Sequence, residues 1–340
     1  MPSFQIDNIA LRYRSRLAFA GSLCELSTNS AALAATLQAT CSAAEDADGE
    51  TEADAFTMRA LVIEPRSERQ SDSQAGVGRP HFRGLQHIVI ASFGGSNVFI
   101  FDQLRRTVSA AVSEAIVRDT PLWRETMLPI TVGVLGAAIA LTPIHCACLG
   151  WNGGGLLVAG ASGAGKSTLA VALAQCGFDY IADDWTYVSL RMGKLAAHGA
   201  SAPVKLLPDA VRHYPILCGR TPRRSMNGEL AYEVDAADTF GARVVPACEP
   251  RWLVFLERRA APGSEFSPMP EGRARAYLEA NVERLPAELH QAAERRARTL
   301  ARIAGLPCWR FRYGGSPQFA AGRLLEIMDR IDGRTGRVRA

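Results

Sequence analysis

One stretch of eight residues constrains this chain more than any other. Residues 160–167 satisfy the pattern G-x-x-x-x-G-K-[ST], with Lys166 and Ser167 at the end. Glycines let the backbone curl tightly enough for several N–H groups to converge on one phosphate chain. A helix that begins at Lys166 would point its N-terminal dipole and its free N–H groups at the same anion. The stretch therefore predicts a phosphate-binding loop (P-loop) between a strand and a helix.

The residues on both sides of this loop fit that prediction. Residues 155–159 (GLLVA) form a short apolar run, and residues 166–176 (KSTLAVALAQC) have helical composition. Residues 178–182 (FDYIA) have the pattern of a second strand, which ends at Asp183 and Asp184. The order strand, glycine loop, helix and strand predicts a βαβ-like unit.

The residue types in the loop indicate a nucleoside triphosphate with Mg²⁺. A lysine ammonium is a compact charge that can lie between β- and γ-phosphates, and a serine hydroxyl can ligate Mg²⁺. Of the 38 cationic residues, only Lys166, Lys194 and Lys205 are lysines, so a lysine in the loop is not this chain's default cation. We therefore expect ATP and Mg²⁺ as cofactors. The expected nucleotide-binding residues are Gly160, Ala161, Ser162, Gly163, Ala164, Gly165, Lys166, Ser167 and Thr168.

Two adjacent carboxylates follow the loop at an informative distance. Asp183 and Asp184 come 17 and 18 residues after Lys166, and one helix and one strand would bring the chain back beside the loop. Neighbouring side chains at a strand end point in different directions, so one could face Mg²⁺ and the other an acceptor hydroxyl. Phosphoryl transfer needs both a metal site and a group that receives the hydroxyl proton. The pair indicates a kinase, although a solvated Asp-Asp turn has the same sequence.

Composition argues against several other classes of protein. A net charge of +4 is too small to indicate nucleic acid as the main partner. The eight cysteines include no C-x-x-C motif, so we expect no structural zinc and assume the reduced thiols of a cytoplasmic protein. Residues 127–157 carry no formal charge, but prolines and glycines interrupt them. We predict a buried core helix at 128–141 and no membrane span.

Two other P-loop classes fit the sequence poorly. GTPases need an N-K-x-D motif, which the positions of the three lysines exclude. A motor ATPase would need a downstream hydrophobic strand that ends in an acid. Residues 253–257 (LVFLE) have that form, but we interpret them as a core strand with an exposed Glu257.

Length and pattern predict two regions and a short tail. With roughly 150 residues per domain, 340 residues suggest two domains. We expect a smaller N-terminal α+β region at 1–119, a P-loop catalytic domain at 120–331, and a frayed tail at 332–340. Expected strands lie at 58–64, 85–93, 97–101, 251–257 and 308–313, expected helices at 273–304 and 317–331, and a solvated acidic loop at 43–55.

The block from His145 to Asp184 resembles the core of HPr serine kinases. That family has a histidine 21 residues before the P-loop lysine, then G-x-S-G-x-G-K-S, then a strand that ends in A-D-D. This chain has His145, the 160–167 loop and Ala182-Asp183-Asp184 at matching spacing. The resemblance implies an α/β fold with a P-loop kinase core of the HPr kinase/PEP carboxykinase type.

The resemblance also implies a role for each matching residue. Lys166 would bind phosphate, and Ser167 would help to bind Mg²⁺. Asp184 would be the proton acceptor, with Asp183 beside the metal and His145 near the reacting phosphate. His145 taken alone could equally be a core histidine on a strand.

The chain departs from the HPr kinase pattern in two places. Thr168 stands where those kinases usually have an acidic residue, and the E-x-R-G-x-G block beyond A-D-D is missing: the chain reads VKLLPDAVRHYPILCGR from Val204. In the family that block is associated with a further metal ligand and with phosphate removal. We therefore expect poor phosphorylase activity and doubt HPr as the substrate. The chain looks more similar to HPr-kinase-like proteins of modified-peptide pathways, such as lasso-peptide precursor kinases.

The expected function is transfer of the γ-phosphate of ATP to a serine of a peptide or protein partner. A small-molecule kinase and a nucleotide-dependent switch without acceptor chemistry remain as alternatives. We expect neither nucleic acid nor a membrane as a partner, and a homo-oligomer stays open. Lys205 could reach a phosphate or an acceptor carboxylate, or it could lie on the surface.

Overall fold

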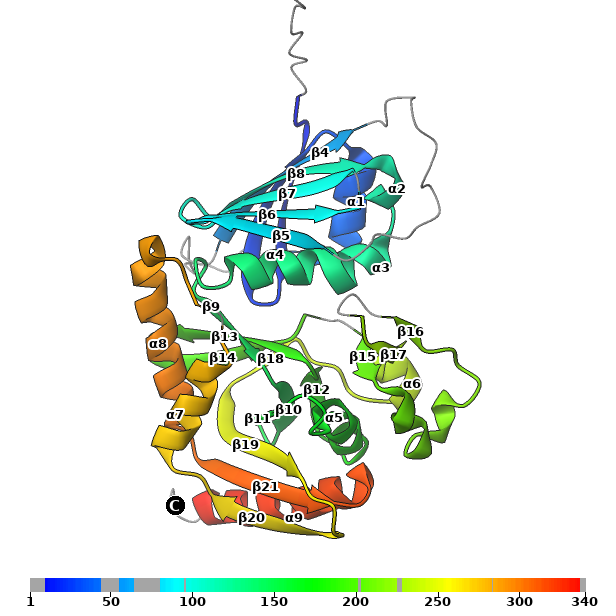
Figure 1. Cartoon of the computed structure of the whole chain (residues 1–340), viewed down its shortest axis with the longest axis vertical. Coiled ribbons are helices and arrows are strands. Elements are labelled where there is room, and N and C mark those ends of the chain that lie inside the picture. Colours follow the sequence, from blue (N-terminus) through cyan, green and yellow to red (C-terminus); the bar gives the residue numbers. More distant parts are fainter. Residues whose placement is uncertain are drawn as a thin grey trace, which may run out of the picture. The chain divides into compact units, whose positions relative to one another are not determined.

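We describe the computed structural model of the chain over residues 10–43, 55–63, 80–94, 96–200, 203–224, 228–282 and 284–336 (Figure 1). The chain divides into two units. Unit 1 comprises residues 1–140 and 285–293, and unit 2 comprises residues 141–284 and 294–340. The division falls after Ala140, later than the expected boundary between 119 and 120, because the helical residues before it pack into unit 1. Trp123, for example, is fully buried and lies against Phe99 with ring centroids 6.0 Å apart.

Unit 1 is built on one mixed sheet of eight strands, with the order β3-β1-β2-β4-β8-β7-β6-β5. Burial alternates along most of its strands, as in β7, so that one face carries the core. The strands are β1 (Tyr13–Phe19), β2 (Ser22–Thr28), β3 (Ser42–Ala43), β4 (Ala55–Ile63), β5 (His81–Leu85), β6 (Ile88–Phe93), β7 (Asn97–Asp102) and β8 (Thr107–Ser113).

The strands expected in unit 1 are present with one change. The stretch 85–93 contains a hairpin turn followed by β6, because Gln86 adopts a positive φ of 54° and reverses the chain. Ala43 ends β3 and Ala55 begins β4, so nearly all of the expected acidic loop lies outside the described residues.

The helices of unit 1 are α1 (Ala31–Thr40), α2 (Glu114–Val117), α3 (Thr120–Leu122) and α4 (Leu128–Leu135), with a π-helical turn at Trp123–Met127. The expected helix at 128–141 is buried but shorter than predicted. It ends at Leu135, since Ala140 has a positive φ of 57° and Leu141 already begins a strand. No helix in the described part of the chain is long and apolar enough to cross a membrane.

The central sheet of unit 2 has the order β12-β10-β11-β19-β21-β20. β11, β19 and β21 are parallel, whereas β10 runs antiparallel to both β11 and β12. All seven residues of β11 are buried, as expected for a central strand covered on both faces. The strands are β10 (Ala147–Trp151), β11 (Gly154–Gly160), β12 (Asp179–Ala182), β19 (Pro250–Arg258), β20 (Gly263–Pro268) and β21 (Cys308–Gly314).

Helices pack on both faces of this sheet. Leu156 and Val158 of β11 belong to the apolar cluster that includes α5 (Lys166–Gln175) and α9 (Pro317–Gly336). The alternate residues of β11 belong to a second cluster, with side chains from α7 (Glu271–Ala280) and α8 (His290–Ala304). The class is therefore mixed α/β with several mixed sheets, in agreement with the coarse prediction.

Two smaller sheets complete unit 2. A four-stranded sheet has the order β18-β14-β13-β9, and a three-stranded sheet has the order β15-β17-β16. Their strands are β9 (Leu141–His145), β13 (Trp185–Arg191), β14 (Lys194–His198), β15 (Val204–Leu206), β16 (Arg223–Arg224), β17 (Leu230–Val234) and β18 (Ala247–Cys248), and the short helix α6 (Ala236–Phe240) follows β17.

The C-terminal elements match their predictions apart from two boundaries. The expected helix at 273–304 is two helices, α7 and α8, because the chain turns after α7 and forms a 3₁₀ turn at Ala287–Leu289, which Pro286 precedes. The expected frayed tail does not begin at 332: α9 continues to Gly336, and the last four residues lie outside the described part.

Candidate active site

The glycine loop joins the end of β11 to the start of α5, as the sequence predicts. Two of its glycines are required by close packing. A Cβ on Gly160 would lie 2.7 Å from the carbonyl oxygen of Leu256 on β19. Gly165 has a φ of +91°, and a Cβ there would lie 2.7 Å from the Tyr313 hydroxyl. Larger residues would push the loop off its neighbouring strands.

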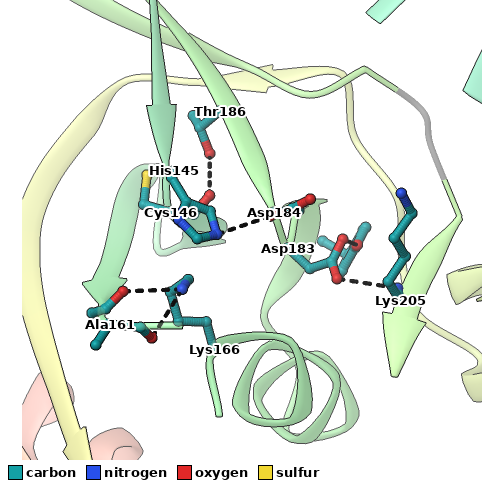
Figure 2. Close-up of polar contacts among 10 residues, drawn as sticks. His145, Cys146, Ala161, Lys166, Asp183, Asp184, Thr186 and Lys205 are labelled. Carbon is teal, nitrogen blue, oxygen red and sulfur yellow. Dashed lines mark hydrogen bonds and ion pairs between the residues drawn. The ribbon is translucent and has the colours of Figure 1, made fainter. Parts of the chain in front are cut away.

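Lys166 is the first residue of α5, and its side chain folds back over the loop. Its exposed fraction is 7%, and its Nζ donates hydrogen bonds to the carbonyl oxygens of Gly160 at 3.0 Å and Ala161 at 3.3 Å (Figure 2). Burial lowers the pKa of Lys166, and the negative charges of Asp184 and Asp183 only partly offset this. Loop carbonyl oxygens are therefore the hydrogen-bond partners of the ammonium.

The two adjacent aspartates follow β12 and have different surroundings. Asp183 is buried and accepts hydrogen bonds from the Tyr180 hydroxyl at 2.8 Å and the Lys205 backbone N–H at 3.3 Å. The Asp184 side chain is 42% exposed and lies 3.0 Å from Nε2 of His145. The expected divergence of the two carboxylates is therefore present (Figure 2).

These surroundings move the pKa values of the two carboxyl groups in opposite directions. Burial and the charge of Asp184 raise the pKa of Asp183 to about 6, against the effect of its hydrogen bonds. Burial alone would also raise the pKa of Asp184, but the His145 hydrogen bond and the nearby positive charges outweigh it and lower this pKa. Asp184 is therefore ionised at neutral pH, whereas the pKa of Asp183 lies nearer to neutral pH.

His145 reaches Asp184 through strand pairing. It ends β9 and pairs in register with Trp185, the first residue of β13, with ring centroids 5.6 Å apart. The Thr186 hydroxyl donates a 2.9 Å hydrogen bond to the carbonyl oxygen of Cys146, which fixes the chain directly after the histidine (Figure 2). The cross-strand register thus places the imidazole against the carboxylate that follows β12.

The oxygen donors near the loop fit a magnesium ion shared with a nucleotide. The Ser167 hydroxyl lies near enough to the Asp183 carboxylate to lower its pKa, so a hydroxyl and a carboxylate lie together beside the loop. Mg²⁺ is usually bound by one or two protein oxygens, and phosphates and water complete its shell. In the described part of the chain no group of three or more His, Cys, Asp or Glu side chains could hold a metal ion. A serine hydroxyl and a carboxylate, as at Ser167 and Asp183, are oxygen donors of the kind that Mg²⁺ takes from a protein.

Several residues at this site carried no signal in the sequence. Tyr180 bonds to Asp183, and Tyr313 lies beneath Gly165. The guanidinium carbon of Arg258 lies 4.5 Å from the ring centroid of Tyr313, at the end of the strand next to the loop. Arg258 is one of 35 arginines, and only the parallel pairing of β11 with β19 distinguishes it. By contrast, the exposed Glu257 pairs with Arg312 at 2.7 Å, as expected for a core strand with an exposed acid.

Comparison with known proteins finds similar solved structures but no matching family model. No curated protein matches the chain either. Among solved structures, the chain is similar to an Hpr(Ser) kinase/phosphatase from Coxiella burnetii. The identity is 13% and the TM-score 0.34, with 58% of this chain and 97% of the other covered. A likeness at this level carries no argument about activity.

Proposed function

We propose that this chain is an ATP-dependent kinase that transfers the γ-phosphate to a serine hydroxyl of a peptide or protein. The observation that carries the proposal is an ionised carboxylate, Asp184, held by His145 beside a glycine loop and its lysine (Figure 2). A protein that merely binds nucleotide needs the loop with Lys166 and Ser167, but it needs no proton acceptor next to them. This difference favours a kinase over a nucleotide-dependent switch.

The loop and the first turn of α5 would bind the phosphates of ATP. Backbone N–H groups from Gly160 to Thr168 would surround the phosphate chain, and Lys166 would exchange its two carbonyl partners for phosphate oxygens. Ser167 and Asp183 would hold Mg²⁺, which when bound neutralises charge on the phosphates. Tyr180 and the Lys205 N–H keep the Asp183 carboxylate oriented toward this position.

Asp184 would then receive the proton of the acceptor. Its lowered pKa keeps it unprotonated, and its exposed side can meet an incoming hydroxyl. The serine oxygen forms a bond to the γ-phosphorus as the bond from that phosphorus to the β,γ-bridging oxygen breaks, and the hydroxyl proton passes to Asp184. His145, 3.0 Å from one carboxylate oxygen, would fix the orientation of the carboxylate.

The peptide acceptor is the finer part of the proposal. It is supported by the resemblance of the 145–184 block to serine kinases and by the missing E-x-R-G-x-G block, which argues against HPr itself and against phosphorylase activity. A lasso peptide precursor is the acceptor that we propose to test first, with the reaction in the cytoplasm. A small-molecule kinase is the second candidate, because the same geometry would serve any hydroxyl.

The direct test is incubation with ATP, Mg²⁺ and candidate precursor peptides, followed by mass spectrometry. We expect one added HPO₃ group on a serine. Lys166→Ala should abolish transfer together with nucleotide binding, since loss of one charged contact at the transferring group costs on the order of 10²–10³ in rate. Phosphate found on a sugar, a nucleotide or a histidine would instead establish the small-molecule alternative or another chemistry.

Substitution of the acids separates the kinase from the switch. Asp184→Asn should block transfer and leave nucleotide binding intact, whereas Asp183→Asn should also weaken the dependence on Mg²⁺. Asp209→Asn is the matched control, because this exposed acid forms its ion pair with Arg212 one turn away. Normal turnover in both active-site variants would mean that the aspartate pair has only a structural role. It would then support the alternative of a nucleotide-dependent switch.

A further inference from the structure

Lys205 belongs to the site through its backbone. It is the middle residue of β15, and its N–H donates the 3.3 Å hydrogen bond to Oδ2 of Asp183. Val204 and Leu206 on either side are fully buried in the core of unit 2. Because side chains alternate along a strand, the Lys205 side chain leaves β15 on the opposite side from these two. The lysine is thus anchored next to the carboxylate that would hold Mg²⁺.

The ammonium of Lys205 forms no close ion pair within the described part of the chain. Its charge acts on the nearby Asp184 carboxylate and helps to lower the pKa of that group, and Glu233 is its cross-strand neighbour on β17. Figure 2 shows the Lys205 side chain to the right of Asp183, with its Nζ at the upper end. In that view Lys166 and Lys205 stand on either side of the aspartate pair. A cation in this position is available to an anion that enters the site.

The use of lysine is itself informative in this chain. Two of the three lysines lie at the site, and Lys194 is exposed at the start of β14. A lysine presents a compact charge on a flexible stem and can follow a phosphoryl group as it moves, whereas the planar guanidinium of arginine favours a fixed bidentate pair. The Asp183 bond places this stem beside the proposed metal and phosphates, which favours a phosphoryl group over the more distant parts of an acceptor.

We propose that Lys205 is a second phosphate-binding cation, whose ammonium contacts the phosphoryl group during its transfer. The inference rests on the proposed kinase function and extends it by one catalytic residue. Equatorial oxygens of a transferring phosphoryl group carry charge that a positioned cation stabilises. Lys166 would contact the phosphoryl oxygens that face the glycine loop, and Lys205 would contact those that face the aspartates.

The test compares binding of Mg·ADP with binding of Mg·ADP plus aluminium fluoride, which mimics the phosphoryl group in transfer. Lys205→Met should leave Mg·ADP affinity unchanged and weaken the aluminium fluoride complex roughly 10- to 100-fold, the range for a lost charged hydrogen bond. Lys205→Arg should recover part of this loss, and Lys194→Met is the matched control that should change neither affinity. We expect Lys205→Met to fold, because the backbone N–H that bonds to Asp183 is retained. Thermal unfolding of the variant checks this.

Four outcomes would overturn the Lys205 role, the proposed acceptor or both. An unchanged aluminium fluoride complex in Lys205→Met contradicts the phosphoryl role, as does a higher KM for the peptide acceptor with normal kcat. If the wild-type protein binds the aluminium fluoride complex more tightly than Mg·ADP but phosphorylates no peptide, the proposed acceptor is wrong and the Lys205 role stands. If aluminium fluoride adds nothing to wild-type binding, both proposals fail.

Discussion

At the scale of single residues, neighbouring acids acquire different chemistry from their surroundings. Asp183 is enclosed and shares its oxygens with a tyrosine hydroxyl and a backbone N–H, whereas Asp184 faces outward beside His145. Burial therefore raises the pKa of Asp183. At Asp184 burial acts in the same direction, but the His145 hydrogen bond and the nearby positive charges together outweigh it and lower the pKa. Two titratable groups with separated pKa values can divide the tasks of metal binding and proton transfer.

The raised pKa of Asp183 has a measurable effect on the stability of the ligand-free protein. Its pKa is about 6 in the fold against 3.8 as the ordinary value, so the fold favours the protonated form. The carboxyl group's contribution to stability is fully present at pH values below its ordinary pKa. It is lost as the pH rises through its pKa in the folded protein. Asp183→Asn stays neutral throughout, so its stability relative to wild type should rise from pH 4 to pH 7 by up to about 3 kcal/mol.

Urea unfolding of both proteins at a series of pH values measures this difference. Asp209→Asn, which removes an exposed acid, should show no comparable rise between the same pH values. A flat difference for Asp183→Asn would mean that the buried carboxyl group titrates as an ordinary aspartate.

At the scale of elements, the glycine loop depends on strands that lie far away in sequence. Gly160 touches β19, and Gly165 touches Tyr313 of β21, so three parallel strands together determine the curvature of the loop. Arg258 donates a hydrogen bond to the carbonyl oxygen of Gly315 and covers the Tyr313 ring, which steadies the same edge of the sheet.

Gly165→Ala should therefore distort the loop and weaken nucleotide binding. The new Cβ would lie 2.7 Å from the Tyr313 hydroxyl at a φ of +91°, so steric overlap adds to backbone strain of about 1–3 kcal/mol. Gly322→Ala in α9 is the control, because no atom lies within 4 Å of its Cβ position and alanine favours a helix. Calorimetric titration with Mg·ADP measures the effect, and equal affinities for the two variants would contradict it.

The cysteines flanking the turn from β9 to β10 should be dispensable for catalysis. Burial raises the pKa of the Cys146 thiol to about 12, and the contact with Cys248 (Sγ–Sγ distance 3.5 Å) together with burial raises that of Cys148. Protonated, enclosed thiols are poor nucleophiles. The double variant Cys146→Ser/Cys148→Ser should unfold at a lower temperature and still transfer phosphate when folded. Loss of transfer below its unfolding temperature would assign a thiol to the reaction.

At the scale of the whole molecule, the boundary between the two units differs from the boundary at 119/120 that the sequence pattern predicts. Unit 1 includes residues 285–293, which come from the C-terminal half, and their Leu289 and Ala292 form a small buried cluster with Ala137. The helical residues before Leu141 are buried in unit 1 through Trp123 and its neighbours. Unit 2 thus begins at a strand, β9, that also supplies His145.

Truncation tests this boundary. A chain that begins at residue 120 would carry the apolar segment around Trp123 and Val132 without the sheet that buries it. A chain that begins at residue 141 would lack that segment. We expect the shorter chain to give the larger soluble yield in matched expression and gel filtration. The opposite order would place the 120–140 segment with unit 2.

The sequence by itself determined the local parts of this protein. The glycine motif, the helix after it and the strand that ends in Asp183-Asp184 all follow from short-range pattern, since backbone curvature and helix polarity depend on adjacent residues. Tertiary structure alone decided that His145 meets Asp184, that Lys205 borders Asp183, and that Tyr313 supports the loop. These contacts arise from strand register and sheet order, which no local pattern encodes, because a strand's partner is selected by packing across the whole fold.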